Sequence, residues 1–191
     1  MVQQRRYKIR YALVALLGAI LALAMTFTSC TSGSNNVSVE EAAKVAVSEI
    51  GEFTSVDLEG NAVSQDIFSQ ADVTMINFWG TFCPPCIKEM PDIQKISEDY
   101  AGKAQVIGIP IDVDFDKKDS AEYKKALEIL GDAGAKFTNI KPTGALKELA
   151  DSMQFVPSTI FVDSEGQVIG DAVVGANLEE YKARLDEQIG K

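Results

Sequence analysis

The chain alternates between short apolar runs, which predict strands, and longer stretches with apolar residues at helical spacing. The runs that indicate strands are 53–57, 61–63, 73–79, 104–111, 137–140, 158–162 and 167–174. Helical spacing and capping residues indicate helices at 38–50, 84–101, 119–130, 143–152 and 177–189. Glu59-Gly60 and Asp163–Gly166 mark hairpin turns. Strands and helices that alternate and end with a hairpin and a helix predict an α/β sandwich around a mixed sheet.

The N-terminal region differs from the rest of the chain. A basic region precedes a run from Tyr11 to Phe27 that is almost wholly apolar, and small polar residues follow. This order is typical of a secretory signal peptide, although an uncleaved membrane anchor has the same pattern. Either alternative predicts that the rest of the chain lies outside the cytoplasm. We therefore expect a lipoprotein-type signal peptide (1–29), a tether with a short helix (30–51) and a globular domain (52–191).

The composition is acidic. The chain has 18 basic and 28 acidic residues, a formal net charge of −10 at pH 7, and no histidine. Segment 1–29 holds four basic and no acidic residues, so its removal would leave 14 basic against 28 acidic residues. Because nucleic-acid-binding proteins present basic surfaces, this charge argues against nucleic acid as a partner.

The candidate chemistry lies in Cys83-Pro84-Pro85-Cys86, between the apolar run 73–79 and the helix that follows it. Two thiols separated by two residues at a strand-to-helix turn can close a small disulfide ring, which suits reversible redox exchange. We expect Cys83 at the helix N-terminus, where free N–H groups and the helix dipole favour a thiolate. Pro84 suits the first helical turn because it has no N–H to lose. Cys83 is therefore the expected nucleophile and Cys86 the resolving thiol.

A Cys-x-x-Cys pair also occurs in zinc half-sites and in structural disulfides. Zinc takes about four ligands, and this chain offers no histidine and one further cysteine, Cys30, so carboxylates would have to complete the site. We therefore expect no metal. A structural disulfide stays open as an alternative, although so short a ring restricts the unfolded chain little.

A longer string surrounds the cysteine pair and reads Asn77-Phe78-Trp79-Gly80-Thr81-Phe82-Cys83-Pro84-Pro85-Cys86-Ile87-Lys88-Glu89-Met90-Pro91. It resembles the active-site region of the TlpA/ResA-like family, membrane-tethered thiol-disulfide oxidoreductases of the redoxin superfamily that act outside the cytoplasm. The resemblance extends from about Phe53 to the C-terminus. It implies the thioredoxin fold, a mixed sheet flanked by helices, with an N-terminal hairpin and a central helix–strand insertion. The activity that it implies is reduction of disulfides in client proteins.

The same resemblance gives Glu89 a role in catalysis. It implies that this side chain approaches the thiols and handles a proton. A carboxyl group buried there would have a raised pKa and could assist deprotonation of Cys86, whereas an exposed position on the helix surface is the alternative. In thioredoxin a buried aspartate lies in the preceding strand. Asn77 occupies that position here, which makes Glu89 the better candidate for proton transfer.

Val156-Pro157-Ser158-Thr159 matches the cis-proline loop of the family. Cis X–Pro bonds are rare, so the sequence alone favours trans, and it is the resemblance that implies cis. Pro157 would then face the cysteine pair as part of the catalytic site, and the backbone of Val156 could pair with an extended substrate segment.

Other residues near the cysteines are candidates for substrate binding. Trp79 and Phe82 would flank the thiols as an apolar docking surface, although core packing of either side chain is the alternative. Pro84 and Pro85, which lie between the cysteines, complete the expected binding residues together with Val156.

Thr28-Ser29-Cys30 resembles the end of a bacterial lipobox, in which the cysteine is lipidated after cleavage. We therefore expect a monomer that a lipid on Cys30 anchors at the extracytoplasmic face of the bacterial cell membrane. The expected partners are disulfides of client proteins, with apocytochrome c or a methionine sulfoxide reductase as candidates, and a membrane thiol that donates electrons. No cofactor is expected beyond the Cys83–Cys86 disulfide.

Three other functions fit part of the pattern. A peroxide-reducing redoxin usually needs threonine and arginine beside its cysteine, and no arginine lies between Arg10 and Arg184. A copper-delivery module would need histidine or another set of soft ligands, and the chain has no histidine. A structural surface lipoprotein stays open as the alternative without catalysis.

Overall fold

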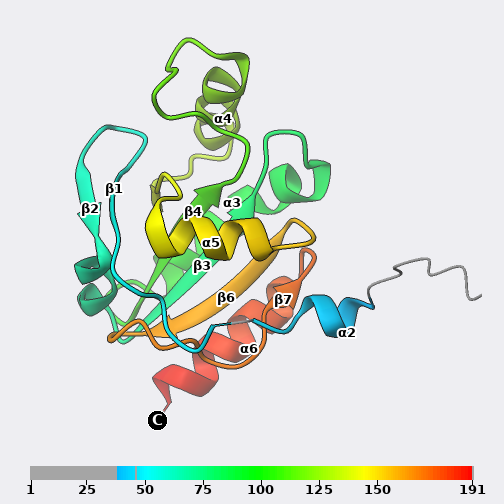
Figure 1. Cartoon of the computed structure of the whole chain (residues 1–191). Coiled ribbons are helices and arrows are strands. Elements are labelled where there is room, and N and C mark those ends of the chain that lie inside the picture. Colours follow the sequence, from blue (N-terminus) through cyan, green and yellow to red (C-terminus); the bar gives the residue numbers. More distant parts are fainter. Residues whose placement is uncertain (1–37, 46, 191) are drawn as a thin grey trace, which may run out of the picture. The chain divides into compact units, whose positions relative to one another are not determined.

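The structure, a computed structural model, describes residues 38–45 and 47–190. Figure 1 shows helices packed around a central sheet, with α5 and α3 on opposite sides of it. In chain order the elements are α2 (Val39–Ala42), β1 (Thr54–Val56), β2 (Ala62–Ser64), the 3-10 helix η1 (Gln65–Gln70), β3 (Val73–Trp79), α3 (Pro84–Asp99), β4 (Ala104–Pro110), α4 (Ala121–Asp132), β5 (Thr138–Asn139), α5 (Gly144–Ser152), β6 (Ser158–Asp163), β7 (Val173–Val174) and α6 (Leu178–Ile189).

β3 is the central strand of a five-stranded sheet with the order β5-β4-β3-β6-β7. β4 runs parallel to β3, with Ile107 opposite Ile76, and β5 runs parallel to β4. β6 runs antiparallel to β3, with Ile160 opposite Ile76, and β7 runs antiparallel to β6. Neighbouring strands and covering helices bury β3 along its whole length, which explains its continuous apolar run. The predicted mixed sheet flanked by helices is confirmed.

Successive side chains of β3 point to opposite faces of the sheet and enter two separate apolar clusters. Met75 and Trp79 pack with residues of α3, α4 and α6 on one face. Ile76 and Phe78 pack with residues of η1 and α5 on the other. Asn77 alternates with Ile76 and Phe78, so its amide lies on the face that α3 and α6 cover.

The predicted N-terminal hairpin and central insertion are both present. β1 and β2 pair antiparallel in a two-stranded sheet of their own. The insertion consists of α4 and β5, and β5 adds to the free edge of β4. The N–H group of Leu58, in the hairpin turn, donates to the carbonyl oxygen of Asn139 at 3.1 Å, so the two additions contact each other.

The N-terminal helix is shorter than predicted. α2 covers a single turn, and the predicted extension to residue 50 is wrong. The N–H group of Ala172 donates to the carbonyl oxygen of Ala43 at 2.7 Å, and the N–H group of Ile50 donates to that of Gly166 at 2.9 Å. These tertiary bonds take up backbone groups that a longer helix would have paired internally. They also place the end of the predicted tether against the fold.

The segment after β6 also differs from the prediction. Its hairpin turn is confirmed, since the N–H group of Asp163 donates to the carbonyl oxygen of Gln167 at 3.0 Å. The predicted strand 167–174 is reduced to β7, because Gly170 adopts a φ of 68°, in the left-handed region where a strand cannot continue. The 3-10 helix η1 was not predicted from the sequence.

Candidate active site

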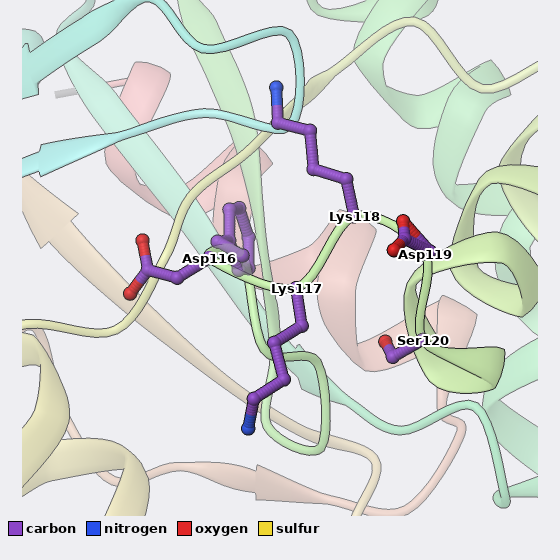
Figure 2. A pocket seen from close by; sticks show the side chains of 6 residues that line it. Asp116, Lys117, Lys118, Asp119 and Ser120 are labelled. Atoms are coloured by element: carbon purple, nitrogen blue, oxygen red, sulfur yellow. The ribbon is translucent and has the colours of Figure 1, made fainter.

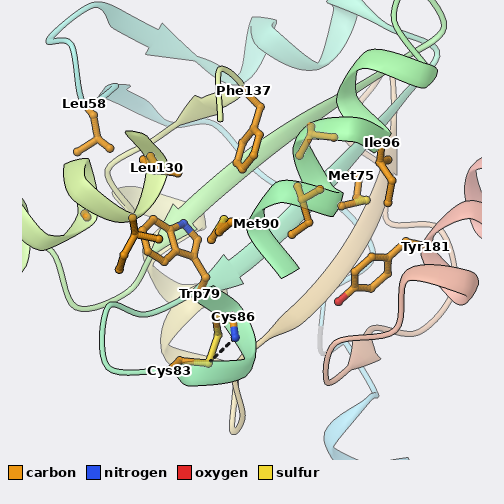
Figure 3. Close-up of a cluster of buried hydrophobic side chains, with 14 of the residues drawn as sticks. Leu58, Met75, Trp79, Cys83, Cys86, Met90, Ile96, Leu130, Phe137 and Tyr181 are labelled. Carbon is orange, nitrogen blue, oxygen red and sulfur yellow. Dashed lines mark hydrogen bonds between the residues drawn. A yellow bond between two sulfur atoms is a disulfide. The ribbon is translucent and has the colours of Figure 1, made fainter. Parts of the chain in front are cut away.

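Cys83 and Cys86 lie where β3 leads into α3, and Figure 3 shows them below Trp79. Their sulfur atoms form a disulfide of 2.02 Å, with the Cα atoms 5.3 Å apart. Cys83 is the N-cap residue of α3, and its Sγ accepts a hydrogen bond from the N–H group of Cys86 at 3.3 Å. Pro84 and Pro85 occupy the first helical positions, where an N–H group would have no intrahelical acceptor. The predicted start of the helix is confirmed.

The helix end favours negative charge on Cys83. The N–H groups of the first turn carry partial positive charge, and the N–H group of Cys86 already points at Sγ of Cys83. A thiolate formed on reduction would keep this contact as a charge-assisted hydrogen bond. Cys86 lies one turn further along and is fully buried, whereas Cys83 retains 3% exposure. This asymmetry agrees with an attacking Cys83 and a resolving Cys86.

The Val156–Pro157 peptide bond is cis, as the family resemblance implied. The carbonyl oxygen of Val156 lies 3.6 Å from Sγ of Cys83. In the disulfide this sulfur carries no hydrogen, so the two atoms are in contact only; a reduced Cys83 could donate its S–H there. The carbonyl oxygen of Pro157 accepts from the N–H group of Gly175 at 2.8 Å, which ties the loop to the segment before α6. The proline loop therefore lies against the cysteine pair.

Glu89 is buried in α3 with 3% of its surface exposed, so the alternative of a surface position is wrong. Its Oε1 accepts from Nδ2 of Asn77 at 3.0 Å, and its Oε2 lies 3.2 Å from the hydroxyl oxygen of Tyr181. Burial raises the pKa of Glu89 from 4.5 to about 7, and Asp92 adds to the rise, while both hydrogen bonds lower it. A carboxyl group that titrates near neutrality, one turn from Cys86, can accept a thiol proton.

Two uncharged side chains from other elements contact this carboxyl group, Asn77 of β3 and Tyr181 of α6, and Thr159 of β6 interacts with both of them. We call these residues and Glu89 the Glu89 cluster. Nδ2 of Asn77 also donates to Oγ1 of Thr159 at 3.0 Å. The two bonds from Nδ2 fix the orientation of the amide, because a flipped Asn77 would turn its oxygen toward the Glu89 carboxylate. Oδ1 of Asn77 has no hydrogen-bond partner among the described residues.

The sequence did not single out Thr159 and Tyr181. Tyr181 fell on the apolar face of the last helix, and it is fully buried there. A buried tyrosine hydroxyl usually has a hydrogen-bond partner, so a tyrosine on an apolar helix face was the one sign in the sequence that such a partner exists. The partner itself, Glu89, lies 92 positions away, so only the packing of α6 on α3 reveals it.

The predicted docking surface is present in part. Phe82 is 64% exposed next to the disulfide, and Pro84 and Pro85 are exposed as well. Trp79 is fully buried in the core (Figure 3). Its Nε1 donates to Oδ1 of Asn139 at 3.0 Å. The docking contact predicted for Trp79 is therefore wrong, because its ring packs inside the molecule and its N–H group is already paired.

Asp112, which the sequence did not single out, anchors the turn between β3 and α3. Its carboxylate accepts the N–H group of Thr81 at 3.0 Å and the hydroxyl of Thr81 at 2.6 Å. Gly80 lets the Phe82 ring lie close to the backbone, because a Cβ at Gly80 would come within 2.6 Å of the ring. These contacts hold the exposed aromatic ring beside Cys83.

A cavity of about 300 Å³ opens beside the start of α3. Its lining residues are Pro85, Lys88, Glu89, Asp92, Ala176 and Leu178. Glu89 is therefore one of the residues that border a hollow in the surface.

A larger cavity, of about 770 Å³, lies in the loop before α4 (Figure 2) and is lined by Phe115, Asp116, Lys117, Lys118, Asp119 and Ser120. None of the predicted site residues belongs to it. Figure 2 shows Lys117 and Lys118 pointing away from each other, and Lys117 pairs with Asp114 at 2.9 Å. These charges belong to a solvated surface loop, and we assign the cavity no function.

Cys30 and the predicted signal peptide lie outside the described residues. Within 38–45 and 47–190, no helix has the length and hydropathy needed to cross a bilayer. The same residues contain no cluster of three or more cysteine, aspartate or glutamate side chains that could hold a metal ion. Lipidation of Cys30 and the expected lack of a cofactor stay predictions.

A Cys-x-x-Cys disulfide at a helix N-terminus, beside a cis-proline loop and on a thioredoxin-like sheet, defines the class of thiol-disulfide oxidoreductases. Sequence comparison agrees, because the family model described as Redoxin matches residues 24–189. The thiol-disulfide oxidoreductase ResA of Bacillus thuringiensis subsp. konkukian (strain 97-27) is 30% identical over 149 residues, which cover 75% of this chain and 76% of that protein. The chain belongs to the redoxin family, in its TlpA/ResA-like branch, and is a thiol-disulfide oxidoreductase.

Solved structures show the same fold. A thiol:disulfide interchange protein of the thioredoxin family from Chlorobium tepidum TLS superimposes with a TM-score of 0.60 at 18% identity, over 75% of this chain and 97% of that one. A secreted Mycobacterium tuberculosis disulfide oxidoreductase, homologous to Escherichia coli DsbE, gives a TM-score of 0.56 at 17% identity, over 71% and 95% of the two chains. At these identities the likeness shows the fold alone.

Proposed function

We propose that this protein reduces disulfides in client proteins outside the cytoplasm, through the Cys83–Cys86 pair. One observation carries the proposal: the N-cap sulfur of α3, Sγ of Cys83, accepts the N–H group of Cys86 and contacts the carbonyl oxygen of Val156. The nucleophile therefore lies beside a backbone group that an extended client segment can pair with. The exposed Phe82 lies next to it as an apolar contact.

The reaction begins with the reduced pair. The thiolate of Cys83 attacks one sulfur of the client disulfide, so that a mixed disulfide forms and the other client sulfur leaves as a thiolate. Cys86 then loses its proton and attacks Sγ of Cys83. The Cys83–Cys86 disulfide forms, and the second client sulfur leaves. Two electrons pass from the cysteine pair to the client.

Glu89 is the proposed acceptor of the Cys86 proton. It lies one turn from Cys86 on the same helix, and burial places its pKa at about 7, between those of an ordinary carboxyl group and a thiol. In the carboxylate form it can take the thiol proton when the mixed disulfide is resolved. The cavity along Lys88 and Asp92 then offers the proton a route to water.

The direction and the location are also proposals. Pro84 and Pro85 place no charge between the cysteines, so neither residue favours a strongly oxidising pair, and we infer a reductase. A membrane thiol carrier would restore the reduced pair after each turnover. Apocytochrome c and a methionine sulfoxide reductase are the candidate clients. A lipid on Cys30 would hold a monomer at the membrane surface. A position outside the cytoplasm is in line with a relative of the same fold that is described as secreted.

Insulin reduction in the presence of dithiothreitol tests the activity. We expect the wild type to accelerate precipitation of the reduced insulin chains, and Cys83→Ser to show only the rate of dithiothreitol alone. Equal rates for the two proteins would contradict the redox function and favour the alternative of a structural disulfide.

Rapid mixing tests the proton acceptor. With Glu89→Gln, formation of the mixed disulfide should keep its rate, because Cys83 is unchanged. Its resolution should slow, because the amide cannot accept the Cys86 proton. If both steps keep their rates and pH profiles, the Cys86 proton passes directly to water.

Detergent partitioning tests the anchor. The wild type should enter the detergent phase, and Cys30→Ser should be soluble or remain an uncut precursor. A soluble wild-type protein with an unmodified Cys30 thiol would contradict the proposed lipidation of Cys30.

A further inference from the structure

The hydroxyl group of Tyr181 lies between two acceptors. Its oxygen is 3.2 Å from Oε2 of Glu89 and 3.0 Å from the carbonyl oxygen of Gly175. A phenol carries one hydrogen, so it can donate to only one of them at a time. Burial and the neighbouring carboxylate of Glu89 raise the pKa of Tyr181 above its usual value, so the phenol keeps its hydrogen at neutral pH.

The two arrangements match the two protonation states of Glu89. When Glu89 is a carboxylate, Tyr181 can donate to Oε2 while Asn77 donates to Oε1. When Glu89 is protonated on Oε2, the acid can donate to the phenol oxygen, and the phenol hydrogen can turn to the carbonyl of Gly175. A hydrogen on Oε1 would instead face Nδ2 of Asn77, which is a donor. The geometry therefore selects Oε2 as the atom that takes up the proton.

We propose that Tyr181 positions Glu89 for proton exchange by turning its hydroxyl hydrogen between Oε2 of Glu89 and the carbonyl oxygen of Gly175. The phenol O–H bond never breaks. The proton that leaves Cys86 becomes bound to Oε2, and the hydroxyl of Tyr181 only rotates. The inference rests on the proposed role of Glu89 in resolving the mixed disulfide.

The surroundings of Glu89 favour this arrangement. The groups that contact it from other elements, Asn77 and Tyr181, are uncharged, and so is Thr159, which lies behind them. The charged neighbours, Lys88 and Asp92, lie on its own helix and line the cavity beside it. A carboxyl group in such a place needs a partner that can both donate and accept, and a hydroxyl does both, whereas Nδ2 of Asn77 only donates.

The second acceptor also connects the cluster to the proline loop. Gly175, whose carbonyl oxygen faces the phenol, donates its N–H group to the carbonyl oxygen of Pro157 at 2.8 Å. A hydroxyl that turns toward Gly175 therefore binds the residue that holds the loop against Cys83. The protonation state of Glu89 can in this way affect the proline loop, where a client would pair.

Tyr181→Phe tests the inference, with Tyr123→Phe as the matched control. Tyr123 is also buried and donates its hydroxyl to a backbone carbonyl, that of Leu58, at 2.7 Å, and it lies in α4, outside the Glu89 cluster. Both variants lose one buried hydrogen bond. We expect Tyr181→Phe alone to raise the pKa of Glu89, by about one unit, because the carboxylate loses a donor. Carbon NMR of the labelled Glu89 carboxyl group measures this pKa in the reduced protein.

A second measurement needs no variant and covers the case in which Tyr181→Phe does not fold. In wild type with tyrosine labelled at the ring carbon that bears the hydroxyl, the Tyr181 signal should shift with the midpoint of the Glu89 titration, and that of Tyr123 should stay constant. A Tyr181 signal that stays constant through this midpoint would overturn the inference. An unchanged Glu89 pKa in a folded Tyr181→Phe protein would overturn it as well.

Kinetics separate this inference from the proposed function. If Tyr181 positions Glu89 and Glu89 takes the Cys86 proton, Tyr181→Phe shifts the pH midpoint of mixed-disulfide resolution upward by the same amount as the Glu89 pKa. If the pKa of Glu89 changes but the pH profile of mixed-disulfide resolution does not, the contact between Tyr181 and Glu89 is supported. The proposed role of Glu89 in the reaction is then contradicted.

Discussion

Glu89 lies in a buried environment, so the folded protein is less stable whenever its carboxyl group is charged. Its pKa rises from 4.5 to about 7 in the folded state, chiefly because burial removes water from the carboxylate. Between these two values the folded chain binds a proton that the unfolded chain does not. Stability therefore falls as the pH rises through this window, and the loss is complete above the folded pKa. Such a cost at a single residue is typical of a functional group.

Glu89→Gln should remove this contribution to the pH dependence of stability. Below about pH 4.5 the variant and the oxidised wild type should differ little, because Glu89 is then neutral in both states. Above about pH 7 the variant should be more stable, by at most about 3 kcal/mol, because a neutral amide replaces a buried carboxylate. Urea unfolding at several pH values measures the difference. Glu148→Gln, at an exposed position of α5, is the control, and its unfolding free energy should follow that of the wild type at each pH. If Glu89→Gln followed the wild type as well, the stability cost of a buried Glu89 carboxylate would be contradicted.

The two cysteines should differ in reactivity. Cys83 lies at the helix N-terminus, where its thiolate accepts the N–H group of Cys86, so its thiol should have the lower pKa. A limiting amount of alkylating reagent added to the reduced protein below pH 7 should therefore label Cys83 first, as peptide mass spectrometry would show. Preferential labelling of Cys86 would reverse the assigned roles.

At the scale of elements, the strand–turn–helix unit of the site could be predicted because its signals are local. The apolar run of β3, the prolines that begin α3 and the cysteine spacing all lie within a few residues of one another. The N-terminal helix was predicted wrongly because the structure of that segment depends on distant partners. The segment after α2 has a helical pattern, but the backbone groups of Ala43, Ser48 and Ile50 hydrogen-bond to residues 166–172 instead. Tertiary pairing of this kind overrides local propensity.

The turn before α3 should depend on Asp112. Asp112→Ala removes the acceptor of the Thr81 N–H group and hydroxyl, which should cost about 1–3 kcal/mol of unfolding free energy. The amide of Thr81 should also exchange faster with solvent. Chemical unfolding and hydrogen exchange measure the two effects. Asp116→Ala is the control, because its exposed ion pair with Lys141 should contribute about 0–1 kcal/mol. Equal losses in both variants would mean that Asp112 does not anchor the turn.

At the scale of the whole molecule, the site is assembled from three distant parts of the chain. The partner of Cys83 in the proline loop lies 73 positions away, and the partner of Glu89 in α6 lies 92 positions away. Cys83, Cys86, Glu89 and Pro157 could be predicted because they stand in strings that resemble a known family. Tyr181 stands in an ordinary amphipathic helix, and its contact with Glu89 depends on which helix packs against that face, so the sequence could not reveal it.

In the proposed reaction, Sγ of Cys83 forms the covalent bond to the client disulfide. Mixing reduced Cys86→Ser with insulin, and identifying any covalent product by mass spectrometry, tests this step directly. Without a resolving thiol, we expect a mixed disulfide on Cys83 to accumulate, whereas the wild type should release reduced insulin chains. Absence of the adduct in a folded Cys86→Ser protein would contradict the role of Cys83 as nucleophile.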